Sequence, residues 1–228
     1  MGGSQRQLLY LVENMDRSRY EPVVVCKDDG PFVDRLRQSC GHAHVMPLRP
    51  WRKLAYLLGR VLDARGLTEL ARAERVDLLH CSDLWMSGYL LLMARRMGLP
   101  SLLHVRVARP PAVLRKHQVH KADGLIAISN RIKRQLLEAG VAESRISVIY
   151  DGVDLADFRA DRVATNVLRR DFPQARGTFV GIVGRIGKSK RQLEFLQTAR
   201  RLVCDEKKDA TFFVVGDPHE PRHYQRVR

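Results

Sequence analysis

Short apolar runs alternate with longer segments of helical period along most of this 228-residue chain. The runs are nearly all apolar, as in strands that are covered on both faces of a sheet. The expected strands are Val23–Cys26, His44–Met46, Asp77–Cys81, Ser101–Val105, Gly124–Ile128 and Ser147–Tyr150. The expected helices are Gln5–Met15, Pro31–Ser39, Trp51–Arg75, Leu84–Met97, Pro111–Lys121 and Arg131–Ala139. This alternation predicts an α/β fold with a doubly wound parallel sheet.

The pattern breaks into a polar stretch after Asp154 and restarts near Gly177. The restart comprises an expected strand, helix and strand at Thr178–Val183, Ser189–Cys204 and Thr211–Val215. We therefore expect a first Rossmann-like domain at residues 1–160 and the start of a second at residues 161–228. The chain opens on Gly2-Gly3 and a helical pattern, whereas a glycine turn in such a fold normally follows a strand. The first strand is therefore expected to be missing, and the chain to be truncated at both ends.

The net charge of +15 and the isoelectric point near 10.3 indicate a polyanionic partner: nucleic acid, an anionic membrane surface or phosphorylated small molecules. No stacking aromatics interleave with the basic residues and no nucleic-acid module is recognisable, which argues against nucleic acid. The four cysteines are scattered without a C-x-x-C pair, as expected of reduced thiols in the cytoplasm. The N-terminus has no apolar signal region, and no apolar run is long enough to cross a bilayer.

A stretch that begins at Trp51-Arg52-Lys53-Leu54 is amphipathic, with Leu57, Leu58, Val61 and Leu62 on one side. Basic residues beside tryptophan and leucine are typical of a helix that lies on a membrane surface. Such a stripe is also typical of a helix that covers a sheet. The sequence leaves both interpretations open.

The segment Gly184-Arg185-Ile186-Gly187-Lys188-Ser189-Lys190 lies between an expected strand and an expected helix. Glycines let the backbone approach a ligand closely, and a helix start offers free N–H groups. Arg185 can bind phosphate oxygens with two donors, and Lys190 adds a compact charge, so the segment suits a diphosphate. The alternative is a solvated basic helix start. The spacing excludes a Walker A loop, which needs glycine where this chain has Ile182.

Two histidine patterns bear on catalysis and metal binding. His104 lies at the C-terminal end of an expected strand, where open α/β sheets bind their ligands and where it can act as a hydrogen-bond donor or a general base. A histidine that is simply satisfied at the strand end is the alternative. His219-Glu220-Pro221-Arg222-His223 matches H-E-x-x-H, but Pro221 opposes the continuous helix that a zinc site needs.

Taken in order, several segments resemble the retaining glycosyltransferases of family 4, which have the two-domain GT-B architecture. The matching segments are Gly2-Gly3-Ser4-Gln5-Arg6, Val76-Asp77-Leu78-Leu79-His80, Ala122-Asp123-Gly124-Leu125-Ile126-Ala127-Ile128-Ser129, Val148-Ile149-Tyr150-Asp151-Gly152-Val153-Asp154, and Val183-Gly184-Arg185-Ile186 with Lys190. The resemblance covers nearly the whole chain. It implies an acceptor-side domain at 1–160 and an incomplete donor-side domain, which binds the nucleotide sugar, at 161–228.

The resemblance also implies roles for single residues. Arg185 and Lys190 would hold the donor diphosphate across an interdomain gap and stabilise the leaving group in place of a metal, so that no metal or other cofactor is needed. The glycine loop, Gly2 and Gly3, would let the backbone approach the donor phosphates or the acceptor. His104 would match the cleft histidine near the reacting sugar.

The implied function is transfer of a sugar, with retention, from a nucleotide diphosphate to a glycan or a lipid-linked acceptor. The location would be the cytoplasm, at the inner membrane face. This chain is expected to be inactive alone, because the family's later glutamate pair lies beyond Arg228. The alternatives are a sugar-nucleotide epimerase of the same fold and a non-catalytic basic binding module.

Three departures from the family pattern stand out. Asp151 replaces the usual asparagine, and Arg191 stands where a glycine usually follows the lysine. Val105 and Arg106 replace the common acidic residue beside the histidine, which weakens the assignment of His104.

Overall fold

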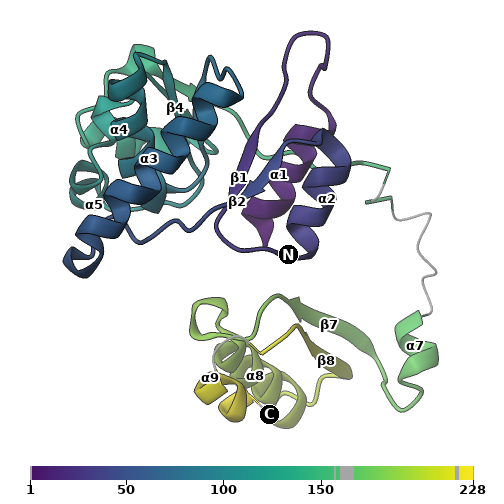
Figure 1. Ribbon diagram of the computed structural model, residues 1–228. Coiled ribbons are helices and arrows are strands. Elements are labelled where there is room, and N and C mark those ends of the chain that lie inside the picture. The colour runs from purple at the N-terminus through teal and green to yellow at the C-terminus, as the bar shows by residue number, and fades with distance from the viewer. Residues whose placement is uncertain (1, 157, 160–166, 219–220, 228) are drawn as a thin grey trace. The chain divides into compact units, whose positions relative to one another are not determined.

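The computed structural model describes residues 2–156, 158–159, 167–218 and 221–227 (Figure 1). The chain divides into two compact units, Met1–Asp157 and Phe158–Arg228, which are called unit 1 and unit 2. The predicted domain boundary at 160–161 lies outside the described residues. Each unit is an α/β structure with parallel strands only, so the predicted fold class is confirmed.

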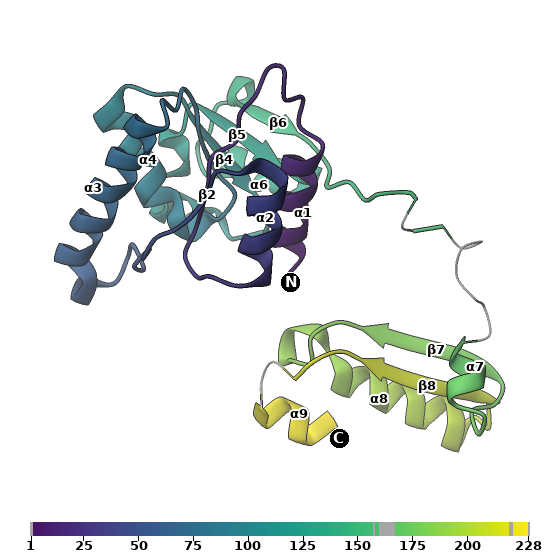
Figure 2. The same cartoon turned by 45° about the vertical axis from the view of Figure 1, so that its right-hand side comes forward.

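The described residues of unit 1 form six strands, which lie in two separate parallel sheets (Figures 1 and 2). One sheet pairs β1 with β2, and the other has the order β3-β4-β5-β6. The strands are β1 (Val24–Cys26), β2 (Ala43–Val45), β3 (Leu79–Cys81), β4 (Ser101–Val105), β5 (Gly124–Ala127) and β6 (Ile146–Val148). In a doubly wound sheet of order 3-2-1-4-5-6, the break between β1 and β3 falls at the place of the first strand. That strand is the one that the sequence pattern lacks.

Helices pack around both sheets of unit 1. The helices α1 and α2 lie beside β1 and β2 (Figure 1). Helix α4 packs on β3 and β4, and α6 packs on β5 and β6. The helices and short 3-10 turns are α1 (Gly3–Glu13), α2 (Pro31–Cys40), η1 (Leu54–Tyr56), α3 (Leu57–Ala73), η2 (Leu84–Met86), α4 (Ser87–Met97), α5 (Pro111–Lys116), η3 (Val119–Lys121), α6 (Asn130–Glu138) and η4 (Glu143–Arg145).

Two hydrophobic clusters match the two sheets. The larger cluster surrounds β4 and β5, where Leu103 and Leu125 are fully buried, and the smaller one joins α1, α2 and β1. Local signals set several ends: the Ser129 hydroxyl accepts a hydrogen bond from the Ile132 N–H and caps α6, and Gly98 ends α4 in the left-handed conformation. The Asp123 carboxylate accepts from both the backbone and the hydroxyl of Ser101, which ties the start of β4 to β5.

Unit 2 contains one parallel pair, β7 (Thr178–Val183) with β8 (Ala210–Val215). The remaining elements are α7 (Val167–Asp171), η6 (Lys188–Lys190), α8 (Gln192–Arg200), a π-helical turn η7 (Arg201–Asp205) and α9 (Pro221–Val227). Phe195 of α8 packs against Phe212 of β8, and Phe172 and Phe179 pack on Phe213.

Three predicted helices are shorter in the structure than the sequence pattern indicates. The stretch Trp51–Arg75 forms an α-helix only from Leu57 and begins with a 3-10 turn at Leu54–Tyr56. The stretch Pro111–Lys121 is interrupted at Gln118, and the helix predicted from Ser189 begins at Gln192; in each case the preceding or interrupting residue has a positive φ. The spacing of apolar residues along a sequence does not predict a residue with a positive φ inside a helical segment.

Candidate functional site

His104 lies near the C-terminal end of β4, as predicted, and is buried. The His80 ring at the end of β3 stacks on it, with ring centroids 5.7 Å apart. Nη2 of Arg106 lies 3.3 Å from Nδ1 of His104. A guanidinium only donates, so Nδ1 accepts and the proton of the neutral ring is on Nε2. His104 therefore offers an N–H donor at Nε2 rather than a base.

The pKa of His104 is lowered to about 4. Burial is the main cause, and the positive charge of Arg106 adds to it. The ring is therefore neutral at physiological pH. Its buried Nε2 atom has no hydrogen-bond partner among the residues that the structure describes. A buried donor without a partner is costly unless a ligand or water satisfies it, which marks this atom as a contact point for a bound oxygen.

Arg106 and Asp151, two of the departures from the family pattern, form an ion pair with each other. Arg106 follows β4 and its side chain is only 9% exposed, while Asp151 follows β6. The carboxylate nearest to this arginine thus comes from the loop after β6 and contacts Arg106, not the His104 ring. The carboxylate of Asp151 neutralises the buried guanidinium charge of Arg106, which would be unfavourable without a partner.

We expect the His104 ring to titrate near pH 4 instead of near 6.5. As the pH falls, His104 is protonated in the unfolded chain near 6.5 but in the folded chain only near 4. Protonation therefore favours the unfolded chain, and the free energy of unfolding decreases as the pH falls from about 6.5 toward 4. The variant Arg106→Gln removes a cation and should raise the pKa, but not to 6.5, because burial remains. Histidine NMR signals followed against pH, with His104→Gln for assignment, measure both values. Titration of His104 near 6.5 in the parent chain would contradict this account.

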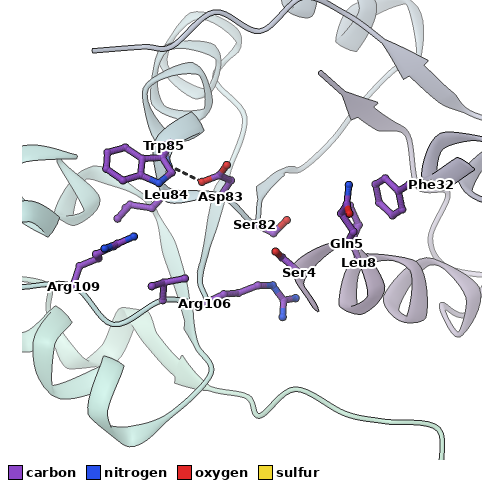
Figure 3. A pocket seen from close by; sticks show the side chains of 11 residues that line it. Ser4, Gln5, Leu8, Phe32, Ser82, Asp83, Leu84, Trp85, Arg106 and Arg109 are labelled. Atoms are coloured by element: carbon purple, nitrogen blue, oxygen red, sulfur yellow. Dashed lines mark hydrogen bonds between the residues drawn. The ribbon is translucent and has the colours of Figure 1, made fainter. Parts of the chain in front are cut away.

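A cavity of about 290 Å³ opens in unit 1 beside these residues (Figure 3). One wall comes from α1 and α2, and the other from the loops after β3 and β4. The lining residues are Ser4, Gln5, Leu8, Phe32, Ser82, Asp83, Leu84, Trp85, Arg106, Val107 and Arg109. Arg106 thus both lines the cavity and bonds to His104. The cavity combines an exposed indole, two guanidinium groups and two hydroxyls, a set that suits a polar anionic ligand with an apolar or ring face.

Trp85 and Arg109 are paired at one side of this cavity. The Arg109 guanidinium carbon lies 5.8 Å from the centre of the Trp85 ring, and Trp85 is half exposed. The Asp83 carboxylate accepts a hydrogen bond from the backbone N–H of Trp85 and so fixes the start of η2 (Figure 3). These residues were not predicted as site residues from the sequence. Their position in the loops after β3 and β4 could have identified them, because open α/β sheets bind ligands at the carboxyl edge.

The glycine loop lies at the start of α1, next to the cavity residues Ser4 and Gln5. Gly2 precedes the helix and its N–H donates to the side chain of Gln5, while Gly3 is the first helical residue. A side-chain carbon added at Gly3 would meet no atom within 4 Å, and at Gly2 only the side-chain oxygen of Gln5, at 3.8 Å. No packing within the chain therefore requires glycine here. The roles predicted for Gly2 and Gly3 stay predictions.

Arg185 and Lys190 of unit 2 lie on the loop that connects β7 with α8, and both are exposed. The side chain of Lys190 runs past Gly184: its Cδ is 4.0 Å from the position of a Cβ at that glycine, directly before Arg185. The two cations are thus carried on one short turn. The predicted binding of a donor diphosphate by Arg185 and Lys190 stays a prediction.

Gln192 holds this loop in shape, a role that the sequence did not reveal. Its side chain is 1% exposed, accepts from the Gly187 N–H at 3.3 Å and donates to the Arg185 carbonyl at 3.1 Å. On the next loop, a side-chain carbon at Gly216 would lie 1.9 Å from the Gly184 carbonyl oxygen, so glycine is required there. The backbone around the two cations is therefore tightly fixed.

Arg191 has a φ of 58°, in the left-handed region that favours glycine. A glycine, which the resemblance would place at this position, would adopt this conformation without strain. The departure at Arg191 leaves the backbone path intact at a modest conformational cost.

The described residues contain no group of three or more His, Cys, Asp or Glu side chains arranged to hold a metal. Helix α9 begins at Pro221, after the first half of the H-E-x-x-H match, and His219 and Glu220 lie outside the described residues. In the described part of the chain, every helix is too short or too polar to span a membrane.

Comparisons with known proteins place these features in context. Residues 1–157 match Glycosyltransferase Family 4. The chain is 25% identical over 232 aligned residues to the UDP-Gal:alpha-D-GlcNAc-diphosphoundecaprenol alpha-1,3-galactosyltransferase of Escherichia coli, covering 95% of this chain and 59% of that protein. It is 28% identical over 179 aligned residues to the 2-deoxystreptamine glucosyltransferase of Streptomyces kanamyceticus, covering 68% of this chain and 46% of that protein.

The fold has close structural counterparts. The structure of Anabaena HepE in complex with UDP-glucose superposes with a TM-score of 0.80 at 19% identity, over 100% of this chain and 61% of HepE. The chain thus spans about three fifths of HepE and less than three fifths of the two curated relatives. The family match covers unit 1 and supports the resemblance that the sequence motifs indicated. This chain belongs to glycosyltransferase family 4.

Proposed function

We propose that this chain carries the acceptor side and part of the donor side of a retaining glycosyltransferase that uses a nucleotide diphosphate sugar. The observation that carries the proposal is the cavity at the carboxyl edge of the parallel strands of unit 1, within the residues that match the family. The relatives named above are transferases of galactose and glucose, which does not favour the epimerase or the non-catalytic module.

In this proposal, the cavity of unit 1 binds the acceptor. Trp85 offers an exposed ring face for a sugar, and Arg106 and Arg109 offer donors for an anionic group. The Escherichia coli relative is named for an acceptor in which a sugar is joined to a lipid through a diphosphate. We propose an acceptor of that lipid-linked class or a glycan, met at the inner, anionic face of a membrane.

The donor diphosphate would bind Arg185 and Lys190. As the bond between sugar and phosphate breaks, negative charge grows on the departing diphosphate, and two fixed cations stabilise that charge without a metal. The Nε2–H of His104 would donate a hydrogen bond to an oxygen of the reacting sugar, in a neutral form that does not compete for the acceptor proton. Because Gln192 fixes the loop of the two cations, the donor meets a preorganised site.

We expect the 228-residue chain to bind UDP and pyrophosphate weakly and to transfer no sugar. It has Arg185 and Lys190, but it spans only 59% of the Escherichia coli relative. Backbone NMR spectra recorded during titration with UDP, pyrophosphate and UDP-galactose should show shifts at residues 184–192. A parallel assay with labelled UDP-galactose or UDP-glucose and a lipid diphosphate sugar should yield no product.

Unchanged spectra at residues 184–192 would contradict the donor role of the loop. Sugar transfer by the chain alone would contradict the expected inactivity and would show that this chain suffices for transfer. Conversion of a UDP-sugar to its epimer without acceptor would instead favour the epimerase.

A further inference from the structure

The first half of α3 exposes a row of large apolar side chains to solvent. Leu58 is 82% exposed and Leu62 is 66% exposed, one helical turn apart, and Val61 lies beside them with 49% exposed. The opposite side of the same helix, with Ala64, Leu67 and Ala71, is buried in the core of unit 1. Helix α3 therefore has two apolar faces, of which only one is covered. We call the exposed one, Leu58, Val61 and Leu62, the α3 face.

The α3 face cannot turn inward, because several contacts fix the rotation of the helix. Asp63 is buried, accepts a hydrogen bond from the Arg49 N–H at 2.9 Å and pairs with the Arg49 side chain. The Tyr89 hydroxyl of α4 lies 3.0 Å from the same carboxylate. The Arg49 side chain also lies directly over Gly59, where any side chain would clash with it. The exposure of the α3 face is thus built into the packing of the helix.

Basic residues surround the α3 face. Arg52 and Lys53 precede the helix and are exposed. Arg52 donates to the Lys116 carbonyl, which brings the basic end of α5 to the start of α3. The acidic groups of α3 do not cancel this charge, because Asp63 is paired with Arg49 and Glu69 with Arg65. An apolar row flanked by exposed cations, which pair with no carboxylate among the described residues, matches a surface that is apolar inside and negatively charged outside.

We propose that the α3 face docks into the headgroup region of an anionic lipid bilayer, with Leu58 and Leu62 entering the apolar boundary and Lys53 contacting lipid phosphates. This docking rests on the proposed function, because it would bring the chain to a lipid-linked acceptor that lies in such a bilayer. Binding to lipid is nevertheless measured without any sugar transfer. A helix rich in charge and anchored by one apolar row is typical of proteins that lie on a membrane surface.

The test measures sedimentation of the 228-residue chain with vesicles of phosphatidylcholine containing one third phosphatidylglycerol, and with pure phosphatidylcholine. The parent chain should bind the anionic vesicles at least about tenfold more strongly than the neutral ones. The double variant Leu58→Gln/Leu62→Gln should weaken binding about tenfold or more, and Lys53→Gln severalfold. Leu155→Gln removes a leucine that is 75% exposed elsewhere in unit 1, and should bind like the parent.

Helical content and thermal unfolding confirm that each variant is folded, which is expected because the changed side chains are exposed. Pyrophosphate binding should be unchanged in the double variant, so that loss of lipid binding and loss of the donor site are told apart. Equal vesicle binding by the parent and the double variant would overturn the proposal. So would equal binding to both vesicle types, or a dimer in solution that the double variant abolishes, since the face would then contact a second copy.

Discussion

Replacing Arg185 with alanine is expected to weaken pyrophosphate binding by about tenfold to a hundredfold, because a charge-assisted pair of hydrogen bonds is lost. Lys190→Ala should cost less, about threefold to tenfold, because an ammonium on a flexible stem binds as a point charge. Isothermal titration of the 228-residue chain with pyrophosphate, and then with UDP, measures both effects.

The matched control is Lys208→Ala. It removes the same charge from unit 2, but Lys208 precedes β8, at the opposite end of the β7–β8 pair from the Arg185 loop. Long-range electrostatics alone would weaken binding equally in all three variants. That outcome would contradict a specific diphosphate site, and added salt would then reduce the effect of all three variants together.

Replacing Asp63 with alanine is expected to lower the free energy of unfolding of unit 1 by about 3 kcal/mol. The carboxylate is buried, accepts from the Arg49 N–H, pairs with the Arg49 side chain and lies within hydrogen-bond distance of the Tyr89 hydroxyl. Its removal leaves the part-buried backbone N–H of Arg49 without its acceptor and breaks the ion pair with the Arg49 side chain. Urea unfolding followed by circular dichroism gives the value.

Glu69→Ala provides the control on the same helix. Its pair with Arg65 is exposed on both sides, so the change should stay within about 0.5 kcal/mol of the parent. The variant Asp63→Asn keeps the shape and some hydrogen bonds, and should fall between the two. A loss in Asp63→Ala no larger than that in Glu69→Ala would show that the Arg49 network contributes little.

Much of the fold could be predicted from the sequence because strands that are covered on both faces are short and apolar. Strand β4 was predicted with both ends correct, and the Ser129 cap and the Gly98 end follow from residue type. The helix interruptions were not predictable, because Gln118 and Arg191 are ordinary residues in a left-handed conformation.

The candidate site was predicted less completely. His104 was located from its position at a strand end, and the Arg185 loop from its glycines and charges. The ion pair between Arg106 and Asp151 was not predicted. These residues lie 45 positions apart and become neighbours only when β4 and β6 are placed in one sheet. Gln192 was missed for another reason: a buried glutamine that holds two backbone groups has no pattern of its own in the sequence.

The break between β1 and β3 has a consequence for ligand size. No backbone ladder joins the two sheets in the part of unit 1 that the structure describes. The walls of the cavity belong to opposite sides of this break, and side-chain contacts such as Gln7 with Gly152 and His44 with Glu74 connect the two sides. Such contacts shift by rotamer changes, which leave each sheet intact. The width of the cavity, and with it the size of ligand that fits, is therefore set by side-chain contacts across the break and not by a continuous backbone ladder.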